Sequence, residues 1–120
     1  MAGKKKAIRT FESGATRNLD DLKLDFEGFL SPLVLERYAQ YMHLHRTQAD
    51  GTVRDADNWQ KGMPLTVYIK SLWRHFFSVW QAHRGIKTKE DIETSLCAVL
   101  FNTSGYLYEI LKEKDIRRNT

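Results

Sequence analysis

The sequence predicts an all-α protein with three main helices, at about residues 31–46, 64–83 and 88–114, and an ordered N-terminal arm. Apolar residues recur at intervals of three and four in each of these segments, which is the period of one helix face. Helix start and stop signals bound the segments, and no alternating stretch typical of a β-strand is long enough to compete. With 120 residues and a hydrophobic fraction of 42%, the chain can form one packed domain.

The first helix is predicted to begin at Ser31-Pro32, because serine is a good N-cap and proline is tolerated in the first helical turn. Asp50-Gly51 is a turn signal that lies well beyond its end. The apolar stripe of this helix consists of Val34, Leu35, Tyr38, Tyr41, Met42 and His45.

The second helix is predicted to begin at Pro64 and to stop at Arg84-Gly85. Lys70 and Arg74 lie on its polar side. Its opposite, aromatic-rich face is predicted to be the core-facing one, and it consists of Ile69, Leu72, Trp73, Phe76, Val79 and Trp80.

Thr88 is predicted to cap the third helix, with Glu90 and Asp91 in its first turn, where acidic residues favour the helix dipole. This helix is apolar on nearly all sides, and such a helix is buried on nearly all sides. Two other helices in so short a chain do not easily cover it. We therefore expect a homo-oligomeric helical bundle that shares the third helix.

Residues 1–13 are predicted to be a flexible basic tail, and residues 14–120 a single helical domain. The net charge is +4, but one run of three lysines without interleaved aromatic residues is a weak signal, so nucleic acid is not an expected partner. Cys97 is the single cysteine, which excludes an intrachain disulfide and suits the cytoplasm. No apolar run reaches the roughly 18 residues of a membrane span, so no membrane association is expected.

The stretch from Asp55 to Trp80 brings polar, basic and aromatic residues close together in sequence. Arginine and lysine pair with phosphate, and tryptophan can stack on a planar base. This grouping favours a phosphorylated, planar ligand, although an ordinary core helix after an ordinary loop explains the same pattern. The candidate binding residues here are Asn58, Trp59, Lys61, Arg74 and His75.

Other chemistry is disfavoured by what the sequence lacks. The four histidines and the lone cysteine have no zinc-site spacing. The chain contains no G-x-S-x-G nucleophile motif, no P-loop and no dinucleotide-binding glycine pattern.

Several short motifs together resemble a known phage family, and they cover nearly the whole chain from Gly14 to Leu111. They are GATRN with a following Asp and Lys, SP-x-x-LE, DNWQKG, RH, and D-x-E followed by FN. The chain is similar to phage dATP/dGTP diphosphohydrolases, which are related to the MazG/MazZ-like all-α nucleotide pyrophosphohydrolases. The resemblance implies cleavage of a purine deoxynucleoside triphosphate into monophosphate and pyrophosphate, for nucleotide-pool control in a phage-infected host cytoplasm.

The resemblance also implies a divalent cation, Mg²⁺ or Mn²⁺, held by hard oxygen ligands. The matching acidic positions make Glu36 and Glu93 the candidate catalytic residues. The candidate metal ligands are Glu36, Asp91, Glu93 and Asn102, and the resemblance adds Arg17 and Lys23 to the phosphate-binding candidates.

The chain departs from MazG-like enzymes at their E-x-x-E and E-x-x-D motifs. Glu36 is followed three residues later by Ala39, and Glu93 by Leu96. Metal-dependent hydrolysis is nevertheless the first hypothesis. A second is a non-catalytic protein that sequesters a nucleotide or nucleotide signal, and a third is a small basic DNA-binding or assembly protein.

Overall fold

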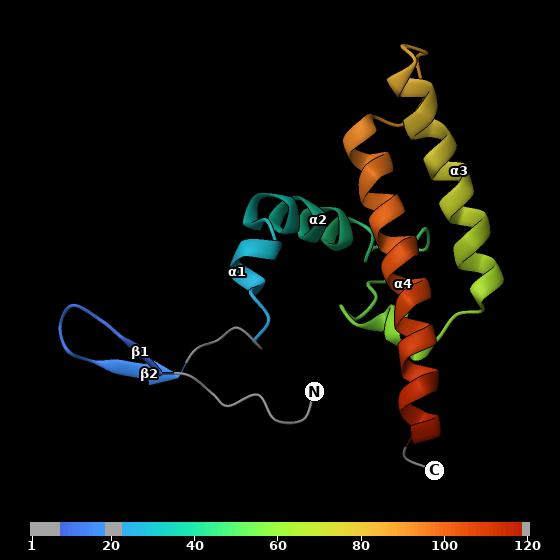
Figure 1. Cartoon of the computed structure of the whole chain (residues 1–120). Coiled ribbons are helices and arrows are strands. Elements are labelled where there is room, and N and C mark those ends of the chain that lie inside the picture. Colours follow the sequence, from blue (N-terminus) through green and yellow to red (C-terminus); the bar gives the residue numbers. More distant parts are fainter. Residues whose placement is uncertain (1–7, 19–22, 119–120) are drawn as a thin grey trace. The chain divides into compact units, whose positions relative to one another are not determined.

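The computed structural model describes residues 8–18 and 23–118. It is mostly helical, which confirms the predicted all-α class (Figure 1). The chain divides into two compact units, Met1–Ser31 and Pro32–Thr120. In chain order, the elements are β1 (Ile8–Thr10), β2 (Thr16–Asn18), α1 (Phe26–Phe29), α2 (Pro32–Leu44), the 3-10 helix η1 (Asn58–Lys61), α3 (Leu65–His83) and α4 (Ile92–Arg118).

The N-terminal unit contains a small antiparallel hairpin in which β1 pairs with β2, with Thr10 opposite Thr16. Gly14 closes its turn at a φ of 88°, a conformation that glycine adopts without strain. The sequence did not predict this hairpin, because three-residue strands are too short to show alternation. The hairpin also crosses the predicted boundary at residue 13, while residues 1–7 of the predicted flexible tail lie outside the described residues.

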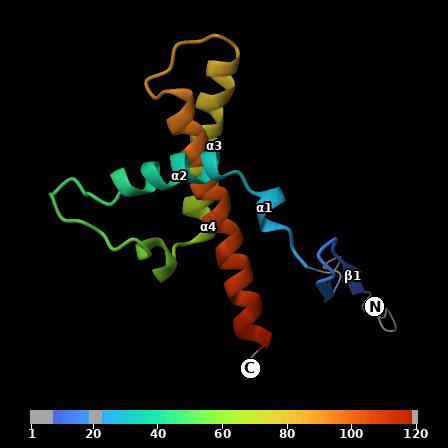
Figure 2. The ribbon, with the colours of Figure 1, turned by 90° about the vertical axis from the view of Figure 1, so that its left-hand side faces the viewer.

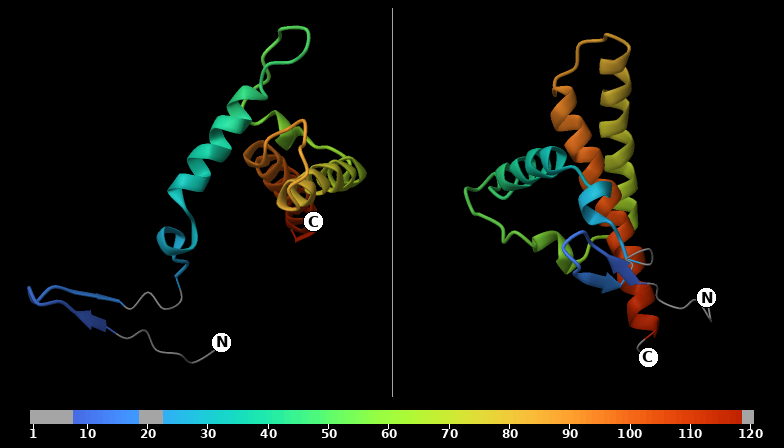
Figure 3. Two further views of the ribbon diagram at one scale, coloured as in Figure 1. Left: turned by 90° about the horizontal axis from the view of Figure 1, so that it is seen from above. Right: turned by 60° about the vertical axis from the view of Figure 1, so that its left-hand side comes forward.

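The second unit is organised around the contact between α3 and α4, which lie side by side (Figures 1 and 3). Tyr68 of α3 is only 1% exposed and lies over Gly105 of α4. A Cβ atom placed on Gly105 would come within 2.2 Å of the Tyr68 ring. The ring of Phe101 lies beside Tyr68, at a centroid distance of 6.0 Å. A tyrosine on one helix therefore fills the space that a glycine leaves on the other.

Helix α2 packs on α4 through a small apolar cluster centred on Tyr41, Cys97 and Ala98. Burial raises the pKa of the Tyr41 phenol to about 12, with a smaller contribution from the Glu90 carboxylate. Farther along the same crossing, Arg37 Nε donates to Glu93 Oε1 at 2.8 Å. Figure 3 shows α2 meeting α4 from the side.

The helix boundaries differ from the sequence predictions at two starts. Pro64 has an extended ψ of 143° and precedes α3, so it is not in the first turn. Helix α4 begins at Ile92 rather than at residue 88, and Asp91 caps it by accepting the Thr94 N–H at 2.7 Å. Thr88 instead donates its hydroxyl to the Glu90 carbonyl, within the turn that precedes the helix. The predicted stop is confirmed, because Gly85 adopts a φ of 79° directly after α3.

The aromatic face of α3 that was predicted to face the core is largely exposed. Tyr68 is the buried residue of α3, and Leu72 and Val79 on its side of the helix are half-buried. By contrast, Trp73 is 66% exposed and Trp80 is 52% exposed. Helix α4 also leaves one stripe exposed, consisting of Leu96, Leu100, Leu107 and Leu111. The helical period alone did not show which of two apolar faces of α3 packs inside the chain.

We predict that Gly105→Ala destabilises the protein. The added methyl group overlaps the Tyr68 ring, and overpacking of this kind costs about 1–3 kcal/mol. Ser104→Ala changes the neighbouring exposed residue and serves as the control. Urea denaturation measures both, and equal midpoints for the two variants would contradict the close contact.

We predict that Tyr68→Phe is neutral or stabilising. The Tyr68 hydroxyl is buried and has no hydrogen-bond partner among the described residues. Removing a buried polar group that lacks a partner relieves a desolvation cost. A loss of more than about 1 kcal/mol in the free energy of unfolding would show that the hydroxyl is bonded, for example to an ordered water.

Candidate functional site

A pocket of about 340 Å³ lies between the end of α2, the following loop, η1 and α4. Its volume falls within the range that small-molecule sites occupy. Basic and aromatic side chains line it together with the amide of Asn58, and they include Tyr41, His45, Arg46, Arg54 and Trp59. The pocket is the candidate functional site.

The loop that follows α2 is folded back on itself as a short antiparallel turn. Thr47 bridges to Val53, and the Arg54 N–H donates to the Arg46 carbonyl at 2.8 Å. Asp50 closes the turn by accepting the Thr52 hydroxyl at 2.6 Å, and hydrogen bonds from Thr52 lower the pKa of Asp50. This turn gives the loop a defined backbone and fixes Arg46 opposite Arg54.

Each of the two arginines is oriented by a hydrogen bond to the loop itself. Arg46 Nε donates to the Arg54 carbonyl at 2.8 Å, and Arg54 Nη1 donates to the His45 carbonyl at 3.1 Å. A guanidinium has five N–H donors, so each side chain keeps donors that can meet an anion in the pocket. Guanidinium groups pair well with phosphate and carboxylate.

Aromatic rings also line the pocket. Trp59 packs edge-on against Tyr108 of α4, with ring centroids 4.8 Å apart and planes at 72°. Tyr41 and His45 lie ring against ring, at 4.1 Å. The His45 ring is also held by a 2.9 Å contact between its Nδ1 and the Tyr41 carbonyl. A flat apolar ligand can pack against these held rings.

The 3-10 helix η1 places Trp59 by docking on α4. The loop leaves α2, returns to α4 as η1, and only then enters α3 (Figure 2). Gly62 ends η1 at a φ of 114°, close to Glu109 and Lys112 of α4. Lys112 also lies over the Tyr108 ring, 5.8 Å from its centroid. The C-terminal half of α4 therefore fixes one side of the pocket.

The structure does not bring the binding residues predicted from the sequence together at one site. Asn58 and Trp59 line the pocket. Arg17 and Lys23 come together in the N-terminal unit, where they line a separate hollow of about 400 Å³. Lys61 and Arg74 are exposed and are not among the residues that line the pocket.

His75 has a structural partner in the described part of the chain. Its Nδ1 lies 3.0 Å from Glu90 Oε2, and the Ser95 hydroxyl donates to the same oxygen at 2.8 Å. The three side chains connect α3 to the start of α4. Because the serine bonds to the glutamate and not to the histidine, they do not form the nucleophile–base pair of a serine hydrolase.

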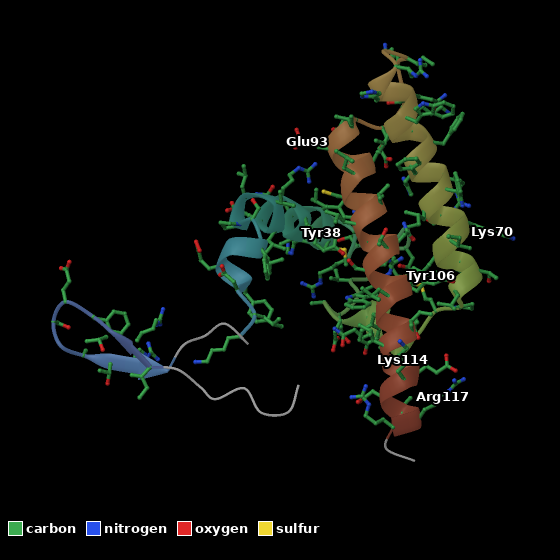
Figure 4. All side chains as sticks on the ribbon, viewed as in Figure 1. Tyr38, Lys70, Glu93, Tyr106, Lys114 and Arg117 are labelled. Carbon is green, nitrogen blue, oxygen red and sulfur yellow. The ribbon has the colours of Figure 1, made fainter. Side chains whose placement is uncertain are left out.

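Most of the predicted metal ligands are occupied by structural contacts. Glu93 pairs with Arg37, and Asp91 caps α4. Asn102 is 4% exposed and donates its side-chain amide to the Ala98 carbonyl, while Glu36 lies exposed on α2. Figure 4 shows Glu93 at the beginning of α4. Among residues 8–18 and 23–118, no group of three or more His, Cys, Asp or Glu side chains is placed to hold a metal ion.

Arg46 and Arg54, the two arginines that line the pocket, were not among the binding residues predicted from the sequence. The available signal was their position on either side of the Asp50-Gly51 turn, because residues that flank a tight turn lie opposite each other. A two-residue turn at Asp50-Gly51 would place Arg46 opposite Asp55. The pairing with Arg54 therefore depends on the register of the Thr47–Val53 bridge.

Comparisons of the chain with protein-family models, with curated proteins and with solved structures found no match. None of the helices that the structure describes between residues 8 and 118 combines the length and apolar composition of a membrane span.

We predict that the cap at Asp91 makes the stability of α4 depend on pH. The Thr94 N–H lowers the pKa of Asp91, so the carboxylate stabilises the folded state above its unfolded pKa of about 3.9, and this contribution disappears as the pH falls through the lower folded value. Asp91→Ala should lower the thermal midpoint at pH 7. Asp91→Asn should keep most of the cap but lose its pH dependence.

Thermal unfolding of the three proteins between pH 7 and pH 2 tests this cap. Identical midpoints for wild type and Asp91→Ala at pH 7 would show that Asp91 is free for another role, such as metal binding.

Proposed function

We propose that the protein binds a purine nucleotide in the pocket between α2, η1 and α4. The observation that carries the proposal is the pairing of Arg46 and Arg54 across the loop turn, in a pocket that Trp59 also lines. Phosphate is anionic and a purine is flat, so one ligand of this class can pair with the arginines and stack on the aromatic rings. Nucleotides are abundant in the cytoplasm, where the buried thiol of Cys97 would also stay reduced.

The base is expected to lie against Trp59 and the Tyr41–His45 pair. Stacking of a base on aromatic side chains contributes about 1–3 kcal/mol. Asn58 precedes Trp59 and also lines the pocket, and its side-chain amide has both donors and acceptors. It can therefore bond to the edge of a purine and fix the orientation of the base.

The phosphate groups are expected to bind Arg46 and Arg54, with the ring of His45 beside them. Asp55 also lines the pocket, and its carboxylate would repel a phosphate placed next to it. We therefore place the phosphates next to Arg46 and Arg54 and away from Asp55. A pocket of about 340 Å³ holds a base and its sugar, which leaves the outer phosphates toward solvent.

Hydrolysis of the triphosphate to monophosphate and pyrophosphate is the second candidate function. The Arg37–Glu93 contact brings α2, which carries Glu36, to the start of α4, where Asp91 and Glu93 lie. The Glu93 side chain is 70% exposed, and exposed ion pairs contribute little to stability. A divalent cation could compete for that carboxylate, but the acidic groups in their present positions favour binding over catalysis.

We predict that Arg46→Ala and Arg54→Ala each weaken dGTP and dATP binding by roughly 10-fold to 100-fold. A hydrogen bond to a charged group contributes about 1.5–3 kcal/mol. Arg74→Ala removes the same charge at an exposed position of α3 that does not line the pocket, and it serves as the matched control. Isothermal titration calorimetry measures the affinities, with circular dichroism as the check on folding.

A pyrophosphate-release assay with Mg²⁺ or Mn²⁺ separates the two candidate functions. Tight binding without release supports the binding function. Release that Glu93→Gln abolishes, without loss of affinity, would establish hydrolysis. An unchanged affinity in both arginine variants would overturn the assignment of the pocket.

A further inference from the structure

Helix α3 has a second apolar face that the rest of the described chain does not bury. It consists of Ile69, Trp73, Phe76 and Trp80, here named the α3 aromatic stripe. These side chains are 37%, 66%, 50% and 52% exposed. Phe77 flanks the stripe and packs edge-on against Trp80 at 6.0 Å.

The stripe has the spacing of a helix–helix contact. Its members follow one another at intervals of four, three and four residues, which is the heptad pattern that seats side chains of one helix between those of another. The charged residues of α3 lie off the stripe. Lys70, one residue beyond Ile69, is about 100° further round the helix, and Figure 4 shows it on the side of α3 away from α4. Covering the stripe therefore removes no charge from water.

We propose that a second copy of the chain covers the α3 aromatic stripe, so that the protein is a two-fold symmetric dimer. Because a two-fold axis brings the same patch of both copies together, an uncharged stripe with regular spacing can pack against itself. The dimer is independent of the proposed nucleotide site. It also places the subunit contact on α3, whereas the sequence pattern favoured a contact through the third helix.

The exposed area fits a dimer contact. An aromatic side chain can bury about 150–250 Å², so Trp73, Phe76, Phe77 and Trp80, each at least half exposed, leave roughly 300–550 Å² uncovered. A standard interface buries about 800 Å² per partner, and somewhat over half of it, roughly 450 Å², is apolar. The four rings can therefore supply the apolar part of such a contact. Ile69, which is 37% exposed, adds to this area.

The small core inside one chain supports the same conclusion. The buried apolar residues of the described chain are Tyr41, Tyr68, Cys97 and Ala98. Burial of apolar surface is the main term that stabilises a fold, and a second copy supplies surface that this core lacks.

Size-exclusion chromatography with light scattering on the full chain at about 100 µM tests the proposal. We expect twice the 14.0 kDa mass of one chain. Phe76→Glu should place a charge in the contact and raise the dimer dissociation constant at least 100-fold. Lys70→Glu introduces the same residue off the stripe and should remain dimeric.

Dilution of the wild type tests dimerisation without any substitution that could disturb folding. Dissociation should expose Trp73 and Trp80 and shift the tryptophan emission to longer wavelength as the mass halves. A wild type that is monomeric at 100 µM would overturn the proposal. It would do so even if the N-terminal unit or a single-stranded nucleic acid were then found to cover the stripe. A folded Phe76→Glu that stays dimeric while Leu100→Glu dissociates would move the contact to α4.

Discussion

The close packing of Tyr68 on Gly105 is the constraint on which the rest of the second unit depends. It brings α3 against one side of α4 with no room for a Cβ atom between them. The other sides of α4 then receive α2, through the Tyr41 cluster, and η1, through Tyr108. Because α2 and η1 both rest on α4, the loop between them is held at both ends. The pocket exists because that loop is held.

The polar groups divide into those that build the fold and those that face the pocket. Asp91, Glu93 and Glu90 cap a helix or join two elements, and His75 shares the last of these contacts. Arg46 and Arg54 are bonded to the loop, and both residues also line the pocket. This division supports the proposed recognition of an anion, since Asp91 and Glu93, two of the acidic residues considered for catalysis, already have structural partners.

The sequence predicted the helices well because their periodicity and end signals are local properties. It placed the end of α3 correctly from Arg84-Gly85, and it found Asn58 and Trp59 of the pocket. It wrongly predicted that the face of α3 with Trp73 lies in the core. Tyr68 and Trp73 both belong to apolar faces, and only tertiary packing chooses between them. The start of α4 was misplaced because Thr88 and Asp91 are both good caps. Arg46 and Arg54 were missed because their proximity arises from the pairing of the loop and not from a helical period.

Nuclear magnetic resonance of the tryptophan indole N–H groups tests the central claim most directly, because the three tryptophans report on different places. Trp59 lines the pocket, whereas Trp73 and Trp80 lie on the exposed face of α3. During titration of ¹⁵N-labelled protein with dGTP, we expect a saturating shift of the Trp59 signal alone. Shifts confined to Trp73 and Trp80, with Trp59 unchanged, would contradict it.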